Sequence, residues 1–119
     1  MRLKNTFGIE VSRLPWKDTV DQTICTDDLT AVLRYIHSSR HIRGSVLVHC
    51  IAGRSRSAAV IVCYLLAVSK GERSYDECVE EVRRVREEVD INEGFAKQII
   101  ALVDEGFFRK IELQGGSHK

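Results

Sequence analysis

The stretch Ser45–Ser57, SVLVHCIAGRSRS, decides the fold that we expect of this chain. Val46–Val48 is a continuous apolar run of the kind that forms a buried parallel strand, and a loop containing Gly53 follows it. From about Arg56 to Ser69 the sequence is apolar almost all round a helix, which predicts a deeply buried helix. A strand–loop–helix turn of this kind points consecutive backbone N–H groups inward, and the helix N-terminus completes a cradle for an anion.

Working outward, the flanking sequence predicts further elements. Phe7–Leu14 has a short strand pattern, residues 16–23 read as a polar loop, and Thr26 or Asp27 is placed to cap a helix. Downstream, Gly71 suits the C-terminal end of the buried helix. Ser74 with Glu77 fits a capping box, and Asn92 caps a last helix. The apolar stripes of the three flanking helices are Leu29, Val32, Leu33 and Ile36; Cys78, Val79, Val82, Val85 and Val89; and Phe95, Ile99, Leu102 and Val103.

This order of elements predicts the fold class. Strand, helix, strand and three helices indicate an α/β fold with a small, largely parallel sheet flanked by helices. The sequence has one proline, no repeat and no low-complexity tract. We therefore expect residues 1–119 to form a single domain.

Composition excludes several classes of protein. The 119 residues carry 18 basic and 17 acidic side chains, a net charge of +1, so we expect no nucleic-acid partner. The longest apolar run, within Ala58–Val68, is too short to span a bilayer, and the first ten residues lack the apolar core of a secretory signal. The four cysteines follow no disulfide or metal spacing, and we expect Cys25, Cys63 and Cys78 to pack in the core. We expect reduced thiols, a cytoplasmic or nuclear protein, and no membrane association.

The chemistry indicated by the cradle depends on Cys50 and Arg56, six positions apart. Backbone N–H groups stabilise a thiolate, so the pKa of Cys50 is expected below the ~8.5 of a free thiol. The same groups hold a phosphate, two oxygens of which Arg56 binds in a bidentate fork. Cys50 then lies behind phosphorus for in-line attack. Gly53 allows the close approach of backbone to ligand.

His49, Cys50, Gly53, Arg56 and Ser57 match in full the signature His-Cys-x2-Gly-x2-Arg-Ser/Thr. In this the chain resembles the cysteine-dependent protein tyrosine phosphatase superfamily, and within it the small, atypical dual-specificity phosphatases. The resemblance covers about residues 8–107 and implies a phosphatase-like α/β fold. It also implies hydrolysis of phosphotyrosine, and of phosphoserine and phosphothreonine, in protein substrates.

The resemblance assigns roles to the signature residues. Cys50 is the nucleophile that forms a phosphocysteine intermediate, and Arg56 is the phosphate clamp. Ser57 eases breakdown of the intermediate by a hydrogen bond to the sulfur, and His49 orients the loop and helps to keep the thiol acidic. No metal or other cofactor is implied. The phosphate-binding loop comprises Ile51, Ala52, Gly53, Arg54, Ser55 and Arg56.

A second match lies upstream, in Leu14-Pro15-x-x-Asp18, which resembles the acid loop of the family. Asp18 precedes Cys50 by 50 − 18 = 32 positions, and the family's general acid lies about thirty residues before its cysteine. An alkoxide leaving group needs such an acid. Asp21 is the local alternative. Downstream, Asn92-x-x-Phe95 resembles a segment that supports the phosphate loop from behind, a role that is compatible with a helix cap.

The chain departs from the family pattern at its start. Members have several strands and a helix before the acid loop, whereas seventeen residues precede Asp18 here. We therefore expect a shortened N-terminus with strands missing or rearranged. The segment Phe108–Leu113 has some strand character and could complete the sheet. Unpaired strand edges favour association with a second copy, so we expect a homodimer, by strand addition or by exchange of Phe7–Leu14 or Phe108–Leu113.

Two other functions compete with the protein phosphatase. The run Ala52–Arg56 also occurs in relatives that act on phospholipids, but those often carry lysine where this chain has Ile51. A phospholipid or RNA-end phosphatase that uses the same site is the first alternative to the protein phosphatase. A non-catalytic phosphate-binding or scaffold module is the second, although such proteins usually lack the cysteine or the arginine that are present here.

Overall fold

The structure is a computed structural model, and it describes residues 2–4, 10–12, 17, 19–43, 56–85, 87 and 89–114. The elements in chain order are β1 (Arg2–Lys4), β2 (Glu10–Ser12), α1 (Thr26–Arg43), α2 (Arg56–Val68), α3 (Tyr75–Val85), α4 (Glu93–Asp104) and α5 (Phe107–Lys110).

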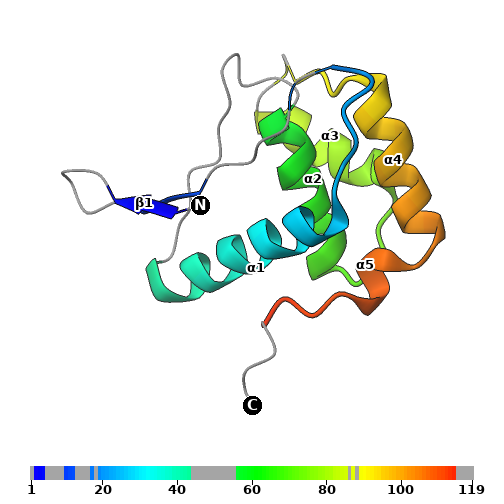
Figure 1. The fold of residues 1–119 in the computed structure, drawn as a ribbon. Helices are drawn as coiled ribbons and strands as arrows, with labels where there is room; N and C mark the ends of the chain where they lie inside the picture. Colours follow the sequence, from blue (N-terminus) through cyan, green and yellow to red (C-terminus); the bar gives the residue numbers. More distant parts are fainter. Residues whose placement is uncertain are drawn as a thin grey trace.

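Helix α2 lies in the middle of the helices, in contact with α1, α3, α4 and α5 (Figure 1). Val62, Cys63 and Leu66 are fully buried, as the nearly all-round apolar sequence predicts. The helix ends in a Schellman motif in which the Gly71 N–H donates to Leu66 O at 2.9 Å. Lys70, at φ +56°, is the left-handed residue of this motif, so the helix ends where Gly71 predicts.

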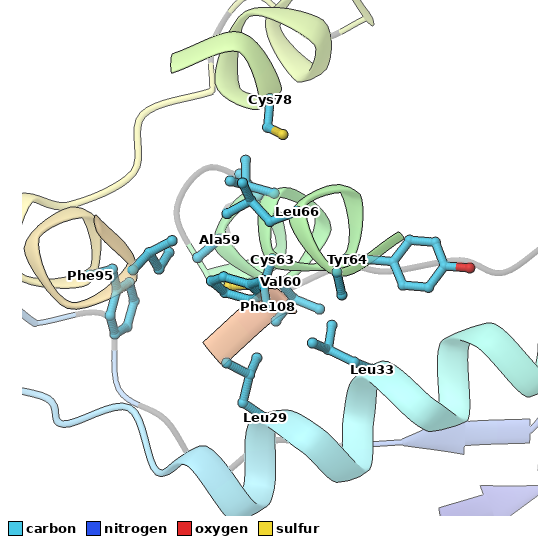
Figure 2. Close-up of a cluster of buried hydrophobic side chains, with 14 of the residues drawn as sticks. Leu29, Leu33, Ala59, Val60, Cys63, Tyr64, Leu66, Cys78, Phe95 and Phe108 are labelled. Carbon is cyan, nitrogen blue, oxygen red and sulfur yellow. The ribbon is translucent and has the colours of Figure 1, made fainter. Parts of the chain in front are cut away.

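Helix α1 crosses α2 and covers one side of it (Figure 1). The four residues of its predicted stripe are all buried, and Leu29 and Leu33 point toward α2 in Figure 2. Ile24, just before the helix, is buried as well. The period of 3–4 residues in the sequence therefore identified the face of α1 that enters the core.

Helix α3 begins with the predicted capping box. The Ser74 N–H donates to Glu77 Oε1 at 2.8 Å, and the Glu77 N–H donates to Ser74 Oγ at 3.1 Å. Cys78, Val79 and Val82 are buried. The stripe was wrong at Val85, which is 84% exposed, because the helix ends at this residue. Val89 is buried beyond the helix, on the chain that leads to α4.

Helix α4 places Phe95 and Ile99 in the core, with Leu102 and Val103 half-buried, as predicted. The strand character expected of Phe108–Leu113 is wrong. Residues 107–110 form α5, whose Phe108 is 1% exposed and packs with the α2 side chains in Figure 2. Burial of this aromatic ring outweighs the weak β preference of the segment.

The described strands form one antiparallel pair, in which Leu3 faces Val11. Strand β2 falls within the predicted strand Phe7–Leu14. The predicted strand Val46–Val48 lies outside the described residues, so the largely parallel sheet stays a prediction. Within the described residues, none of the helices combines the length and the apolarity that crossing a bilayer requires.

Candidate functional site

The structure describes three of the residues that the sequence assigns to the site: Arg56, Ser57 and Asn92. The predicted nucleophile Cys50, its neighbour His49, loop residues 51–55 and the predicted acid Asp18 lie outside the described residues. The segments that flank them in the sequence are described, residues 19–43 and helix α2.

Helix α2 begins at Arg56, the last residue of the predicted phosphate-binding loop. The Arg56 side chain is half-buried with its Nε atom inaccessible to solvent, and Ser57 is only 6% exposed. The first turn of α2 contains no acidic residue, so no carboxylate of its own offsets the positive end of the helix dipole. A helix that starts here, with this polarity, is what the predicted anion cradle requires.

Asn92 joins the start of α4 to the acid segment, by which we mean residues 17–24. Its Oδ1 accepts from the Phe95 N–H at 2.9 Å, which confirms the predicted helix cap. Its Nδ2 donates to the Thr19 carbonyl at 3.4 Å, so the same side chain also reaches the residue that follows Asp18. Its support of the phosphate loop stays a prediction, because that loop is outside the described residues.

Gly94 brings the first turn of α4 into direct contact with the acid segment. A Cβ added to Gly94 would lie 2.1 Å from the Val20 carbonyl oxygen, so no side chain fits there. Figure 1 shows the acid segment, in blue, passing the yellow start of α4 near the top of the view. Only glycine permits this approach without moving one of the two backbones.

Gln98, one turn further along α4, binds the backbone of the acid segment at two points. Its Oε1 accepts from the Ile24 N–H at 2.7 Å, and its Nε2 donates to the Gln22 carbonyl at 2.8 Å. These pairs are 74 and 76 residues apart in the chain, so they are tertiary contacts. Helix α4 thus holds the acid segment through Asn92, Gly94 and Gln98.

Asp21, the alternative acid, is exposed on this segment. A hydrogen bond with the Thr19 side chain, followed by one from its own backbone N–H and the charge of Lys17, holds the pKa of Asp21 below its ordinary value against a small opposing effect of desolvation. Asp21 is therefore a carboxylate near neutral pH and a poor proton donor.

The three described cysteines differ in how far their thiols are exposed to solvent. Cys63 and Cys78 are buried in the core, as predicted, and burial raises the pKa of each thiol. Cys25, which follows the acid segment, is exposed, so the expectation that it packs in the core is wrong. Cys25 precedes the first turn of α1, where the chain passes from loop to helix at the surface.

Gly94 and Gln98 are the residues that sequence reasoning missed. A glycine in the first turn of a helix was a usable signal, since glycine is disfavoured there unless the backbone needs the space. Gln98 left no such signal, because its partners are set by tertiary packing and not by any local pattern.

Comparisons with known proteins agree on one family. Residues 2–105 match the family described as "Dual specificity phosphatase, catalytic domain". Dual specificity protein phosphatase 22-A of Danio rerio is 43% identical over 67 residues, which are 56% of this chain and 31% of that protein. Dual specificity protein phosphatase 22 of Mus musculus is 30% identical over 92 residues, covering 77% and 48%. Phosphatidylglycerophosphatase and protein-tyrosine phosphatase 1 of Homo sapiens is 37% identical over 104 residues, covering 80% and 49%.

The chain spans about half the length, or less, of the curated relatives that it matches. The family match nevertheless covers most of the chain, includes residues 49–57 that carry the signature, and implies the α/β fold of these phosphatases. The resemblance inferred from the signature is thereby confirmed: the chain belongs to the dual specificity phosphatase catalytic-domain family, within the cysteine-dependent protein tyrosine phosphatase superfamily.

Proposed function

We propose that this chain is a cysteine-dependent phosphatase that hydrolyses phosphotyrosine, and also phosphoserine and phosphothreonine, in protein substrates. The observation that carries the proposal is the start of α2 at Arg56 in a chain of this family. The six residues from Cys50 to Ser55 then lead directly into a helix N-terminus, the arrangement that binds a phosphate dianion.

The first chemical step transfers the phosphoryl group to sulfur. The Cys50 thiolate attacks phosphorus, the bond from phosphorus to the substrate oxygen breaks, and Asp18 donates its proton to that oxygen. Arg56 and the backbone N–H groups of residues 51–56 stabilise the negative charge on the three non-bridging oxygens, which stay on phosphorus and are transferred with it. The products are the free alcohol or phenol, the phosphocysteine and an ionised Asp18.

The second step returns the enzyme to its starting state. Asp18, now a carboxylate, takes a proton from water as the water oxygen attacks phosphorus, and the bond from phosphorus to sulfur breaks. Ser57 stabilises the departing thiolate by donating a hydrogen bond to sulfur. Inorganic phosphate leaves, and Asp18 is protonated again. No metal takes part in either step of this proposal.

Turnover of p-nitrophenyl phosphate tests this function. The Cys50→Ser variant should fall to background, since the hydroxyl is far less nucleophilic than a thiolate, while phosphate binding persists because the cradle is backbone. The matched control is Cys25→Ser, which removes an exposed thiol of the same chain and should retain full turnover. Turnover that survives Cys50→Ser overturns the proposal.

A phospholipid phosphatase is a second candidate, because one human relative named for phosphatidylglycerophosphatase activity is similar over 80% of the chain. Ile51 speaks against it, since lysine is common at this position in lipid-acting relatives. A panel of phosphotyrosine and phosphoserine peptides, phosphoinositides and phosphatidylglycerophosphate in vesicles separates the two. Higher kcat/KM on a lipid than on every peptide would favour the second candidate. An RNA-end phosphatase has no observation in its favour.

The remaining predictions belong to the same proposal. Residues 1–119 act as one catalytic domain, with Val46–Val48 as a strand of a small sheet that ends at the phosphate loop. Asn92 supports that loop as well as capping α4, and His49 orients it. Free thiols at Cys25, Cys63 and Cys78 support a reducing compartment, cytoplasmic or nuclear. A non-catalytic module is excluded only by measured turnover.

A further inference from the structure

The side-chain amide of Gln98 joins α4 to two backbone groups of the acid segment by hydrogen bonds. A third bond runs from Nε2 to the Gly94 carbonyl at 3.1 Å, within α4 itself. These three partners determine which way the amide points. The Ile24 N–H requires Oε1 on its side of the amide, and the Gln22 and Gly94 carbonyls require Nε2 on theirs. All three bonds are therefore satisfied by a single orientation of the amide.

These hydrogen bonds are partly shielded from water, which increases the cost of losing them. Gln98 is half-buried, and Ile24, whose N–H it accepts, is only 6% exposed. Water therefore replaces the amide poorly if the side chain is removed, and the buried N–H of Ile24 would lose its partner. Gln98 binds backbone atoms of the acid segment, so this clamp holds the path of the chain at Gln22 and Ile24.

The clamp extends to both covalent neighbours of Asp18. The Gln22 side chain accepts from the Lys17 N–H at 2.9 Å, and the Gln22 N–H donates to the Thr19 carbonyl at 3.2 Å. Thr19 is also held by Asn92. Gln22 is thus the link: Gln98 holds its carbonyl, and its other polar groups hold Lys17 and Thr19, on either side of residue 18.

We infer that Gln98 is a positioning residue for the general acid, acting through the backbone of Gln22 and Ile24. The inference rests on the proposed function and deepens it. Gln98 touches neither substrate nor phosphate in this account. It sets the place from which the Asp18 carboxyl delivers its proton, so its loss should slow only those reactions that need the proton.

This role has a signature that a merely structural residue lacks. A general acid matters most when the leaving group is a poor one, such as phenol or an alcohol, and least when it is an acidic phenol. A residue that acts only on overall stability would slow both kinds of substrate equally. The leaving-group dependence of kcat/KM therefore separates the two roles.

The experiment compares two variants of Gln98 with a control on the same helix. Gln98→Met keeps the length of the side chain and loses all three bonds, whereas Gln98→Glu keeps an acceptor for the Ile24 N–H and loses the donor to Gln22. Lys97→Ala removes the exposed neighbouring side chain and is the control. Circular dichroism and thermal unfolding identify any variant that fails to fold, and Gln98→Glu is the conservative variant that keeps the test open.

The substrates are phenyl phosphate and a fluorinated phenyl phosphate with an acidic leaving group. For phenyl phosphate we expect Gln98→Met to lower kcat/KM by about 10–100-fold, part of the ~10²–10⁴-fold that a general acid contributes. For the fluorinated substrate we expect Gln98→Met to lower kcat/KM by at most about threefold. On phenyl phosphate, kcat/KM of Gln98→Glu should lie between those of the wild type and Gln98→Met. Lys97→Ala should match the wild type on both substrates. Equal losses on both substrates overturn the inference.

A double-mutant cycle with Asp18→Ala gives the stricter test. If Gln98 acts through Asp18, then Gln98→Met should cost less than about twofold on phenyl phosphate once Asp18 is already alanine. Full additivity of the two losses would mean that Gln98 acts by another route, and it would overturn the inference even where the substrate series supports it.

Failure of the proposed function is distinguishable from failure of the clamp. A wild-type chain that hydrolyses neither substrate overturns the function and the catalytic role together. Hydrogen–deuterium exchange then tests the clamp by itself: Gln98→Met should speed exchange of the Ile24 amide by about tenfold or more, relative to Lys97→Ala. An unchanged Ile24 amide in an active enzyme overturns the clamp and leaves the function standing.

Discussion

At Gly94 the backbone of the acid segment leaves no space for a side chain on α4. Replacing it by alanine puts a Cβ 2.1 Å from the Val20 carbonyl oxygen, so one backbone must move. We expect Gly94→Ala to lower the free energy of unfolding by about 1–3 kcal/mol. Helix propensity alone predicts the opposite sign, a gain of up to ~1 kcal/mol.

Urea unfolding measures the effect of Gly94→Ala. The control is Ala101→Gly, an exposed position of the same helix, where the propensity term acts alone and a loss of about 0.5–1 kcal/mol is expected. If Gly94→Ala is more stable than the wild type, the close approach of the two backbones is not as the structure has it.

Asp18 and Asp21 are the two candidate acids, and the spacing to Cys50 in the sequence favours Asp18. A hydrogen bond with the Thr19 side chain lowers the pKa of Asp21. The carboxylate form of Asp21 is thereby favoured, which makes Asp21 a poor general acid near neutral pH. We expect Asp18→Ala to slow phenyl phosphate hydrolysis by about 10²-fold or more, and Asp21→Ala to change it by no more than about threefold. Steady-state kcat/KM of the two variants decides the assignment, and the reverse pattern would transfer the acid role to Asp21.

At the scale of elements, local signals in the sequence predicted most of the helical part of the fold. The stripe of α1, the Ser74–Glu77 capping box and the Asn92 cap each depend on residues within one or two turns, and the structure confirms all three. The start of α2 at Arg56 was also readable, because an apolar run begins immediately after a loop sequence.

The sequence did not predict features that depend on contacts between distant residues. Gln98 binds a segment more than seventy positions away, which no periodicity reveals. Residues 107–110 form α5 because Phe108 fills a place against α2, although the local pattern suggested a strand. Val85 fits the stripe of α3 but lies in its last turn, beyond the region that the core covers.

Helix α2 carries a buried thiol, Cys63, that we expect to make the stability of the fold sensitive to alkaline pH. Burial raises the pKa of Cys63 above the ~8.5 of a free thiol, and the neighbouring Cys78 adds to the shift. The folded state keeps the proton that the unfolded chain releases. This contribution to stability is therefore fully present below about pH 8.5 and is lost as the pH rises, by up to ~1.4 kcal/mol per pH unit for one thiol.

Urea unfolding between pH 8 and pH 10.5 measures this loss. Cys63→Ala should be less stable than the wild type at pH 8, because a cavity replaces the sulfur, and its stability should fall less steeply as the pH rises. Equal slopes for the two proteins would mean that Cys63 ionises in the folded state as it does in the unfolded chain.

At the scale of the whole molecule, the C-terminal segment is fastened to the helices that precede it. Arg34 Nε donates to the Glu112 carbonyl at 2.7 Å, and Lys70 Nζ donates to the Ile111 carbonyl at 2.9 Å. With Phe108 buried as well, this segment packs as helix α5 and the residues after it, not as a strand, and association by its exchange stays a prediction.

Association itself stays a prediction, by strand addition or by exchange of Phe7–Leu14 or Phe108–Leu113. Sedimentation velocity at increasing micromolar concentrations should show a dimer that grows with concentration. A single monomeric species over the whole range would contradict it and would leave the catalytic proposal unaffected.

The central claim is that the phosphoryl group passes through Cys50, and trapping the intermediate tests it most directly. p-Nitrophenyl phosphate, whose acidic leaving group needs no proton from Asp18, is mixed with Asp18→Ala, in which water attack lacks its base, and the reaction is quenched within the first turnover. Mass spectrometry of the digested protein should then find one phosphate, on the peptide that contains Cys50, and none in the Cys50→Ser variant. Phosphate on any other residue, or turnover with no phosphorylated protein at any time, would contradict the account.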